Sequence, residues 1–227
     1  EGTRLPSGAR SGFFLGDGTG VGKGRQISGT ILEYWRLEGR RVLWLSVSTD
    51  LKWDAERDLR DLNSVEKIPV YPKGSGTIPP GKLESKGIGD GVLFATYSLL
   101  VSGSLVGKRP RGGKGGDDDL FKVKAGSRLA QIRDWLTASD QDPLIIFDEC
   151  HKAKNLVTAS GKPTKTAQSV VVLQNAIPNA RVLYCSATGA SEPQNLGYMV
   201  RLGNFGFDSF SDFKTTIESA GMGAMEM

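Results

Sequence analysis

The stretch P-L-I-I-F-D-E-C-H, residues 143–151, carries the strongest fold signal in the chain. Its apolar half, Pro143 to Phe147, predicts a buried strand that runs directly into Asp148 and Glu149. Ligands of α/β sheets bind beyond the carboxyl ends of the strands. An Asp there can hold Mg²⁺, and a neighbouring Glu can orient and deprotonate an attacking water. Asp148 and Glu149 are therefore candidate catalytic residues, with Asp148 the candidate magnesium ligand; an acidic helix N-cap is the alternative.

A glycine-rich loop, Asp17 to Arg25, lies between a predicted strand, Gly12 to Leu15, and a predicted helix, Lys23 to Glu38. Glycines let successive N–H groups turn toward an anion, the helix N-terminus adds positive charge, and Lys23 can bridge the outer phosphates. The common Walker A pattern is G-x-x-x-x-G-K-[ST], from which this loop departs at Asp17 and at Gly24. Gly24 replaces the residue that usually holds magnesium. The candidate ATP-binding residues are Thr19, Gly20, Val21, Gly22, Lys23, Gly24 and Arg25, with Lys23 also catalytic; a turn without a ligand is the alternative.

A third feature, Ser186-Ala187-Thr188, follows another predicted strand, Arg181 to Cys185. Small hydroxyl residues at this place can hydrogen-bond across to the acidic motif. His151, the single histidine of the chain, is expected to hydrogen-bond toward Ser186 or Thr188. In this position it would sense the bound nucleotide and link the ATP state to the closure of this lobe of the protein on a second one. A satisfied polar side chain without such a role is the alternative.

Apolar runs and helical stretches alternate along the whole chain. Further strands are predicted at 41–47, 68–71 and 92–96, and further helices at 51–62, 128–136, 164–176, 192–202 and 211–220. This alternation is typical of a three-layer α/β fold with a mainly parallel sheet, here a single domain over residues 1–227. Residues 103–126 are rich in glycine and charge, which predicts a flexible insertion. Its basic half could contact nucleic acid or act as a targeting signal; a plain solvated insertion is the alternative.

Composition narrows the class of protein. The net charge of +4 and the pI near 9.0 mildly favour a polyanionic partner such as nucleic acid. The two cysteines, Cys150 and Cys185, make neither a disulfide framework nor a zinc signature. The sequence has no signal peptide and no apolar run near the roughly 20 residues of a membrane span, so no membrane partner is expected. The abrupt ends are typical of an excerpt from a longer protein.

Together the three motifs resemble motifs I, II and III of superfamily 2 helicases. The strings G-D-G-T-G-V-G-K-G-R (16–25), W-L-S-V-S-T-D-L-K-W-D-A-E-R-D-L (44–59), F-D-E-C-H-K-A-K-N (147–155) and S-A-T-G-A-S-E-P (186–193) are similar to the strawberry notch family. So are F-A-T-Y-S (94–98) and G-A-M-E (223–226). Residues 73–89 and 103–126 do not share this resemblance.

The resemblance implies a RecA-like P-loop lobe of a nuclear, helicase-like ATPase that acts on chromatin or nucleic acid (DNA or RNA) with other transcription regulators. It also implies that Gly24 is a trait of the family. The hydroxyl that Gly24 lacks as a magnesium ligand could be replaced by a water, or by a hydroxyl elsewhere such as that of Thr19. A complete motor needs a second RecA-like lobe, which normally carries an arginine finger worth roughly 10³–10⁵ in rate. We therefore expect this chain alone to bind ATP weakly and to hydrolyse it very slowly.

The same resemblance places motif Ia at Ser48, Thr49, Asp50 and Lys52, and motif Ib near Thr96 and Tyr97. In related helicases these turns contact the nucleic-acid backbone, so Ser48, Thr49, Lys52 and Thr96 are candidate nucleic-acid contacts. Helix capping by the same hydroxyl and carboxylate groups is the alternative.

Two other functions stay open from the sequence. A transcriptional co-regulator could keep the fold as a scaffold without hydrolysing ATP, in keeping with Gly24. A small P-loop kinase is a weaker third reading, because no acceptor-binding lid is evident and the S-A-T turn would have no role.

Overall fold

The computed structural model describes residues 2–18, 20–62, 68–102, 123–154, 163–187 and 193–220. Within them, six strands form one sheet in the order β1-β6-β5-β2-β4-β3, and every neighbouring pair is parallel. The strands are β1 (Phe13–Leu15), β2 (Arg41–Ser46), β3 (Val70–Tyr71), β4 (Gly91–Thr96), β5 (Leu144–Phe147) and β6 (Arg181–Cys185). The predicted α/β class with a mainly parallel sheet is confirmed.

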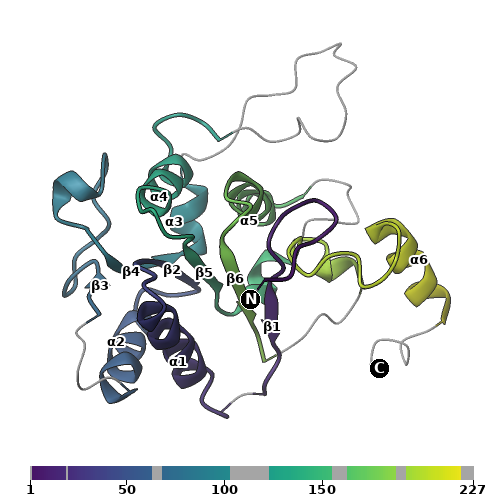
Figure 1. Cartoon of the computed structure of the whole chain (residues 1–227), viewed down its shortest axis with the longest axis horizontal. Helices are drawn as coiled ribbons and strands as arrows, with labels where there is room; N and C mark the ends of the chain where they lie inside the picture. Colours follow the sequence, from purple (N-terminus) through teal and green to yellow (C-terminus); the bar gives the residue numbers. More distant parts are fainter. Residues whose placement is uncertain are drawn as a thin grey trace.

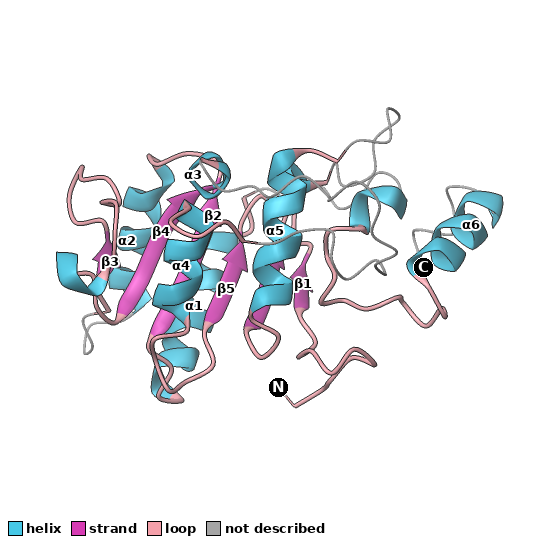
Figure 2. Cartoon of the chain, turned by 90° about the horizontal axis from the view of Figure 1, so that it is seen from above, coloured by secondary structure: helices cyan, strands magenta, loops and turns pink. Residues whose placement is uncertain are grey.

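Helices cover both faces of this sheet (Figure 1). On one face lie α1 (Lys23–Arg36) and α2 (Leu51–Leu62), and on the other lie α3 (Tyr97–Val101), α4 (Arg128–Leu136) and α5 (Lys165–Ala176). A last helix, α6 (Phe210–Ala220), stands away from the sheet, on the side of β1 (Figure 2). Three short 3₁₀ helices complete the described elements: η1 (Glu84–Lys86), η3 (Cys150–Ala153) and η4 (Pro193–Leu196).

The period-2 alternation of the central strands builds two separate cores. In β2, Leu43 and Leu45 point into the core under α3, α4 and α5, whereas Val42 and Trp44 point into the core under α1 and α2. All six residues of β2 are buried, as expected for a strand covered on both faces. This explains why the central strands read as continuous apolar runs.

Most predicted elements agree with the structure to within one or two residues at each end. One prediction is wrong in the described part of the chain: a helix was expected over 192–202, yet the described residues 193–202 contain only η4, followed by turns. Gly197 interrupts the helical pattern. After it, the backbone conformation is set by contacts with the core. Gln174 Nε2 donates to the carbonyl of Tyr198 at 2.9 Å, so this carbonyl is bonded across the fold and not along a helix.

The predicted insertion, 103–126, falls largely outside the described residues. Of its last four residues, Val123 packs against the larger core. Thr19, Thr188 and the closing segment 223–226 also lie outside the described part. Both cysteines are buried and free. No helix in the described ranges is long and apolar enough to cross a membrane.

Candidate functional site

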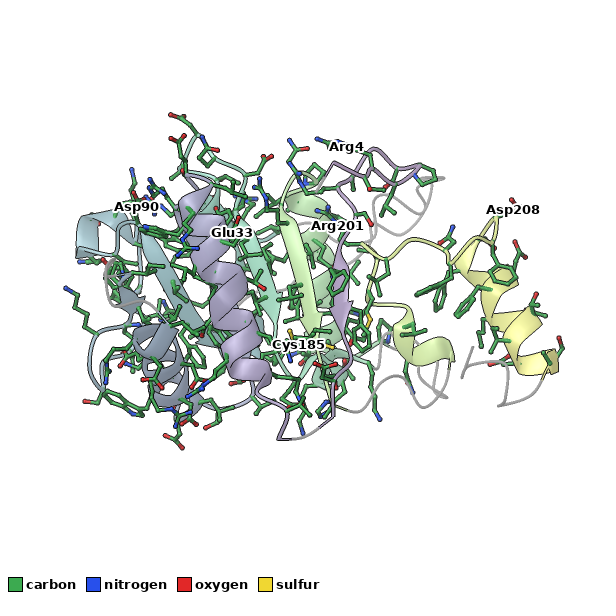
Figure 3. All side chains as sticks on the ribbon, turned by 60° about the horizontal axis from the view of Figure 1, so that its bottom comes forward. Arg4, Glu33, Asp90, Cys185, Arg201 and Asp208 are labelled. Carbon is green, nitrogen blue, oxygen red and sulfur yellow. The ribbon has the colours of Figure 1, made fainter. Side chains whose placement is uncertain are left out.

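Strand register brings the three motifs to one edge of the sheet. Leu15 of β1 pairs with Cys185 of β6, and Phe147 of β5 pairs with Tyr184 of β6. The three strands therefore end side by side, and they are followed by the phosphate loop, the turn at Ser186 and Asp148. The backbone N–H of Ser186 donates to the carbonyl of Leu15 at 3.2 Å, which continues the ladder past the strand ends. Figure 3 shows Cys185 at the end of the sheet where α1 begins, with Glu33 near the other end of that helix. All three sequence motifs therefore meet where parallel sheets bind ligands.

The phosphate loop is closed by its own side chains. The ammonium of Lys23 donates to the carbonyls of Gly18 at 2.8 Å and Asp17 at 3.1 Å. Gln26, one turn into α1, donates from Nε2 to Oδ2 of Asp17 at 2.7 Å. Asp17 thus has a defined task at the position where the usual pattern has glycine. A bound phosphate would take the Lys23 ammonium from these carbonyls.

Two glycines give this loop its shape. Gly20 has φ 81° and Gly22, the N-cap of α1, has φ 83°. These left-handed values cost a residue with a side chain roughly 1–2 kcal/mol. Gly22 also offers no side chain to cap the helix, so no side-chain group competes for the first N–H groups of α1. An exposed helix N-terminus of this kind is suited to hold phosphate oxygens.

Asp148 is held by two hydrogen bonds in a buried place. Its Oδ2 accepts from the hydroxyl of Ser46 at 2.8 Å, and its Oδ1 accepts from the N–H of Glu149 at 3.0 Å. Burial raises the pKa of this carboxyl above its ordinary value, although the Ser46 hydroxyl acts in the opposite direction. The hydroxyl of Tyr97 fixes the backbone by donating to the carbonyl of Asp148 at 2.9 Å.

Glu149 sits in a left-handed conformation, with φ 48° and ψ 46°. A residue with a side chain rarely adopts it, because its Cβ crowds the following carbonyl. Residues in such strained conformations are enriched at active sites. Here Oε2 of Glu149 lies 3.2 Å from Nδ1 of His151. Nδ1 also lies 3.1 Å from Oγ of Ser186, so the predicted contact between His151 and Ser186 is present. Ala187 follows Ser186 in the same turn.

The donor set fits a magnesium ion carried by a nucleotide. Mg²⁺ prefers oxygen ligands and usually keeps several waters, binding one or two carboxylates and the substrate phosphates. Asp148 supplies such a carboxylate, and a cation beside it would offset the cost of burying its charge. Among the described residues, no group of three or more His, Cys, Asp or Glu could hold a metal ion.

The candidate nucleic-acid contacts have different surroundings. The hydroxyl of Thr96 caps α3 by accepting from the N–H of Leu99 at 3.2 Å, and Ser48 Oγ accepts from the N–H of Asp50 at 3.3 Å. Lys52 is only 5% exposed, and its ammonium donates to the carbonyls of Pro72 at 2.8 Å and of Gly74. These bonds favour a structural role for Lys52. Thr49 and Ser48 remain on the surface beyond the end of β2, on the same edge as the nucleotide motifs.

Comparisons with known proteins agree with this geometry. The family described as "P-loop containing NTP hydrolase pore-1" matches residues 1–227. The chain belongs to this family.

The strawberry notch proteins are homologues of this chain. Protein strawberry notch homolog 1 of Rattus norvegicus is 50% identical over 99% of this chain, and Protein strawberry notch of Drosophila melanogaster is 48% identical over 98%. Protein FORGETTER 1 of Arabidopsis thaliana is 46% identical over 98%. The chain spans 17%, 13% and 16% of these relatives. The strawberry notch resemblance is confirmed.

A solved structure confirms the RecA-like fold. The SWI2/SNF2 ATPase core of Sulfolobus solfataricus, in complex with dsDNA, aligns with a TM-score of 0.53 and 17% identity, over 92% of this chain and 35% of that one. At this identity the match shows the fold of a RecA-like P-loop lobe.

Sequence reasoning missed two residues of this P-loop site. Gln26 stands three residues after Lys23, on the same helical face, so spacing could have found it. Ser46 reaches Asp148 only because β2 and β5 are neighbours, and no local pattern carries that information.

Proposed function

We propose that this chain is the ATP-binding lobe of a helicase-like ATPase that couples ATP binding and hydrolysis to nucleic acid or chromatin during transcription regulation in the nucleus. The observation that carries the proposal is the meeting of Lys23, Asp148 with Glu149, and Ser186 at the ends of β1, β5 and β6. Family membership and the strawberry notch homologues support an NTP hydrolase.

Each residue has a separate task in this proposal. Lys23 and the N–H groups of the phosphate loop hold phosphate oxygens, and Asp148 holds Mg²⁺, which neutralises charge on the phosphates. Glu149 orients the attacking water and accepts its proton. His151 contacts both Glu149 and Ser186, so a change at the hydrolytic carboxylate is passed to the turn after β6.

A nucleic-acid partner is supported by the fold neighbour, which was solved with dsDNA. Ser48 and Thr49 lie beyond the end of β2, beside the nucleotide motifs, where they could contact a phosphodiester backbone. Because the chain covers 12–17% of its curated relatives, the second RecA-like lobe and its arginine finger belong, in this proposal, to the rest of the whole protein.

The test is ATP hydrolysis by the whole protein, with Lys23→Ala, Glu149→Gln and the control Lys86→Ala. Lys86 is an exposed lysine in η1, which precedes β4. It therefore lies toward the amino ends of the strands, whereas the site lies at their carboxyl ends. We expect Lys23→Ala to lose nucleotide binding. Glu149→Gln should keep binding but slow turnover by about 10²–10⁴. Equal rates in all four proteins would reject an ATPase and favour the scaffold alternative.

The 227-residue chain alone gives a second test. We expect it to bind ATP weakly and to hydrolyse it very slowly, because the arginine finger of the second lobe is not part of it. Rapid hydrolysis that nucleic acid stimulates, by residues 1–227 alone, would contradict this expectation.

A further inference from the structure

Gly24 follows Lys23 at the start of α1, where the usual phosphate loop has Ser or Thr. The space beside the Cα of Gly24 is occupied by the side chain of Asp58. A β-carbon built on Gly24 would overlap Oδ2 of Asp58 and lie 3.5 Å from its Cγ. Asp58 belongs to α2, which packs beside α1 on the same face of the sheet (Figure 1). The carboxylate of Asp58 therefore occupies the space in which the β-carbon of a Ser or Thr would lie.

Helix geometry says which way this carboxylate lies. Every Cα–Cβ bond of an α-helix tilts toward the N-terminus of the helix. A side chain at position 24 would project back toward the phosphate loop, and Asp58 Oδ2 lies in its path. The carboxylate thus sits at the end of α1 where the phosphate-binding N–H groups begin.

Asp58 is also buried with one oxygen accounted for. The residue is 7% exposed, and its Oδ1 accepts from Arg57 Nη2 at 3.0 Å and Nε at 3.2 Å. Within the described part of the chain, no hydrogen bond to Oδ2 is present. Among the described residues, Oδ2 of Asp58 is not one of the buried side-chain atoms that lack a partner, so this oxygen reaches solvent and is open to a water or a cation. Arg57 is largely exposed, so water weakens its compensation of this charge.

We propose that Asp58 supplies, directly or through a water, the magnesium-facing oxygen that Gly24 lacks. The inference rests on the proposed ATP site and adds a ligand to it from a different helix. A carboxylate in place of a hydroxyl adds one negative charge beside the phosphates. Nucleotide without a cation is repelled by it, and nucleotide with a divalent cation is held more tightly. The site therefore depends on the metal more strongly than a loop with Ser or Thr.

Asp58 could instead only pack α2 against α1, and the two roles make different predictions. If Asp58 faces the cation, Asp58→Asn weakens metal binding but leaves metal-free nucleotide binding unchanged or stronger. If Asp58 only packs, both affinities fall together or neither changes. Asp61→Asn is the matched control, because Asp61 lies one turn further along α2 and pairs with Arg25 at 3.3 Å.

The experiment measures binding of Mn²⁺, as a probe for Mg²⁺, to the 227-residue chain saturated with ATPγS, by electron paramagnetic resonance of free Mn²⁺. Nucleotide affinity in excess EDTA is measured in parallel, and thermal unfolding checks each variant. We expect Asp58→Asn to weaken Mn²⁺ binding by about tenfold or more, and Asp61→Asn to stay within about twofold of the wild type. The double variant Gly24→Ser with Asp58→Ala restores a hydroxyl and makes room for it. It should bind Mn²⁺ more tightly than Asp58→Ala alone.

Three results would overturn the inference: wild-type Mn²⁺ affinity in Asp58→Asn, a parallel loss of metal-free nucleotide binding, or no recovery in the double variant. Failure of the proposed function looks different. In that case the wild-type chain itself would not bind ATPγS at any Mn²⁺ concentration, and the assignment of Asp58 would fall with it.

Discussion

Nδ1 of His151 lies 3.1 Å from the hydroxyl oxygen of Ser186, across the boundary between β5 and β6. The same nitrogen lies 3.2 Å from Oε2 of Glu149. One imidazole therefore touches both the carboxylate proposed to activate water and the turn proposed to report on it. This contact makes the coupling hypothesis measurable.

His151→Ala and Ser186→Ala should not act independently. Because the pair shares a hydrogen bond, we expect a coupling energy of about 0.5–1.5 kcal/mol in a double-mutant cycle on urea unfolding of the chain. In the whole protein, both single variants should lower stimulated ATP turnover more than nucleotide affinity. Additive effects on stability and unchanged turnover would show that the contact has no coupling role.

Asp148→Asn should stabilise the folded chain at pH 7. Burial raises the native pKa of Asp148 above its ordinary value of 3.8. The contribution of this group to the free energy of unfolding therefore favours the folded state below pH 3.8, and it is lost as the pH rises through the raised pKa. Removing the charge removes this penalty at neutral pH. Urea unfolding from pH 4 to 8 should show an advantage of Asp148→Asn that shrinks toward pH 4. A variant that is less stable at pH 7 would contradict the prediction.

Arg201, in the segment after η4, is predicted to make a large contribution to the stability of the folded chain. It is 1% exposed, and its guanidinium donates to the carbonyls of Arg10, Gln174, Ile177 and Pro178. Arg201→Ala leaves these buried acceptors unpaired and should cost at least about 3 kcal/mol in denaturant unfolding. Arg201→Lys should restore only part, since an ammonium has three donors. The control Arg133→Ala, at a more exposed ion pair with Asp134, should stay within about 0.5 kcal/mol.

Replacing Glu149 by glycine should separate strain from chemistry. Glu149→Gly relieves a φ of 48° and should raise the unfolding free energy by about 0.5–1 kcal/mol while it abolishes hydrolysis by the whole protein. Glu149→Gln keeps the strained backbone and should lose hydrolysis without that gain. Glu38→Gly is the matched control, because Glu38 has φ 64° just after α1, outside the site. It should stabilise the chain and leave hydrolysis intact.

Lys52→Met should change stability and not nucleic-acid binding. The variant keeps the apolar stem but leaves two carbonyls and Glu56 without their ammonium partner, so we expect a loss of about 1–3 kcal/mol. The nucleic-acid affinity of the folded protein should stay within about twofold, a change of about 0.4 kcal/mol. Lys86→Met, at an exposed position, should affect neither quantity. A large loss of affinity in stable Lys52→Met would return Lys52 to the nucleic-acid interface.

Much of the fold was predictable because its signals are local. The strands β2, β4, β5 and β6 are short apolar runs, and helices α2 and α4 begin and end where periodicity and charge predicted. Residues 193–202 were not predictable, because their conformation depends on groups outside the segment: Gln174 donates to the carbonyl of Tyr198, and its own carbonyl accepts from Arg201. Helix α3 was also missed, since its five residues are too few for a periodic pattern.

The sequence by itself determined the class of the site: which residues follow which strands, and hence a phosphate loop, a paired carboxylate and a hydroxyl turn at one edge. Only the tertiary structure decided which groups complete it. Lys52 proved to be bonded to Pro72, and Asp58 proved to fill the space beside Gly24. The reason is physical: a motif is a run of neighbours along the chain, whereas α1 and α2 meet only when both pack on the same sheet. A missing hydroxyl is visible in one string of residues; its replacement, carried on another helix, is visible only in space.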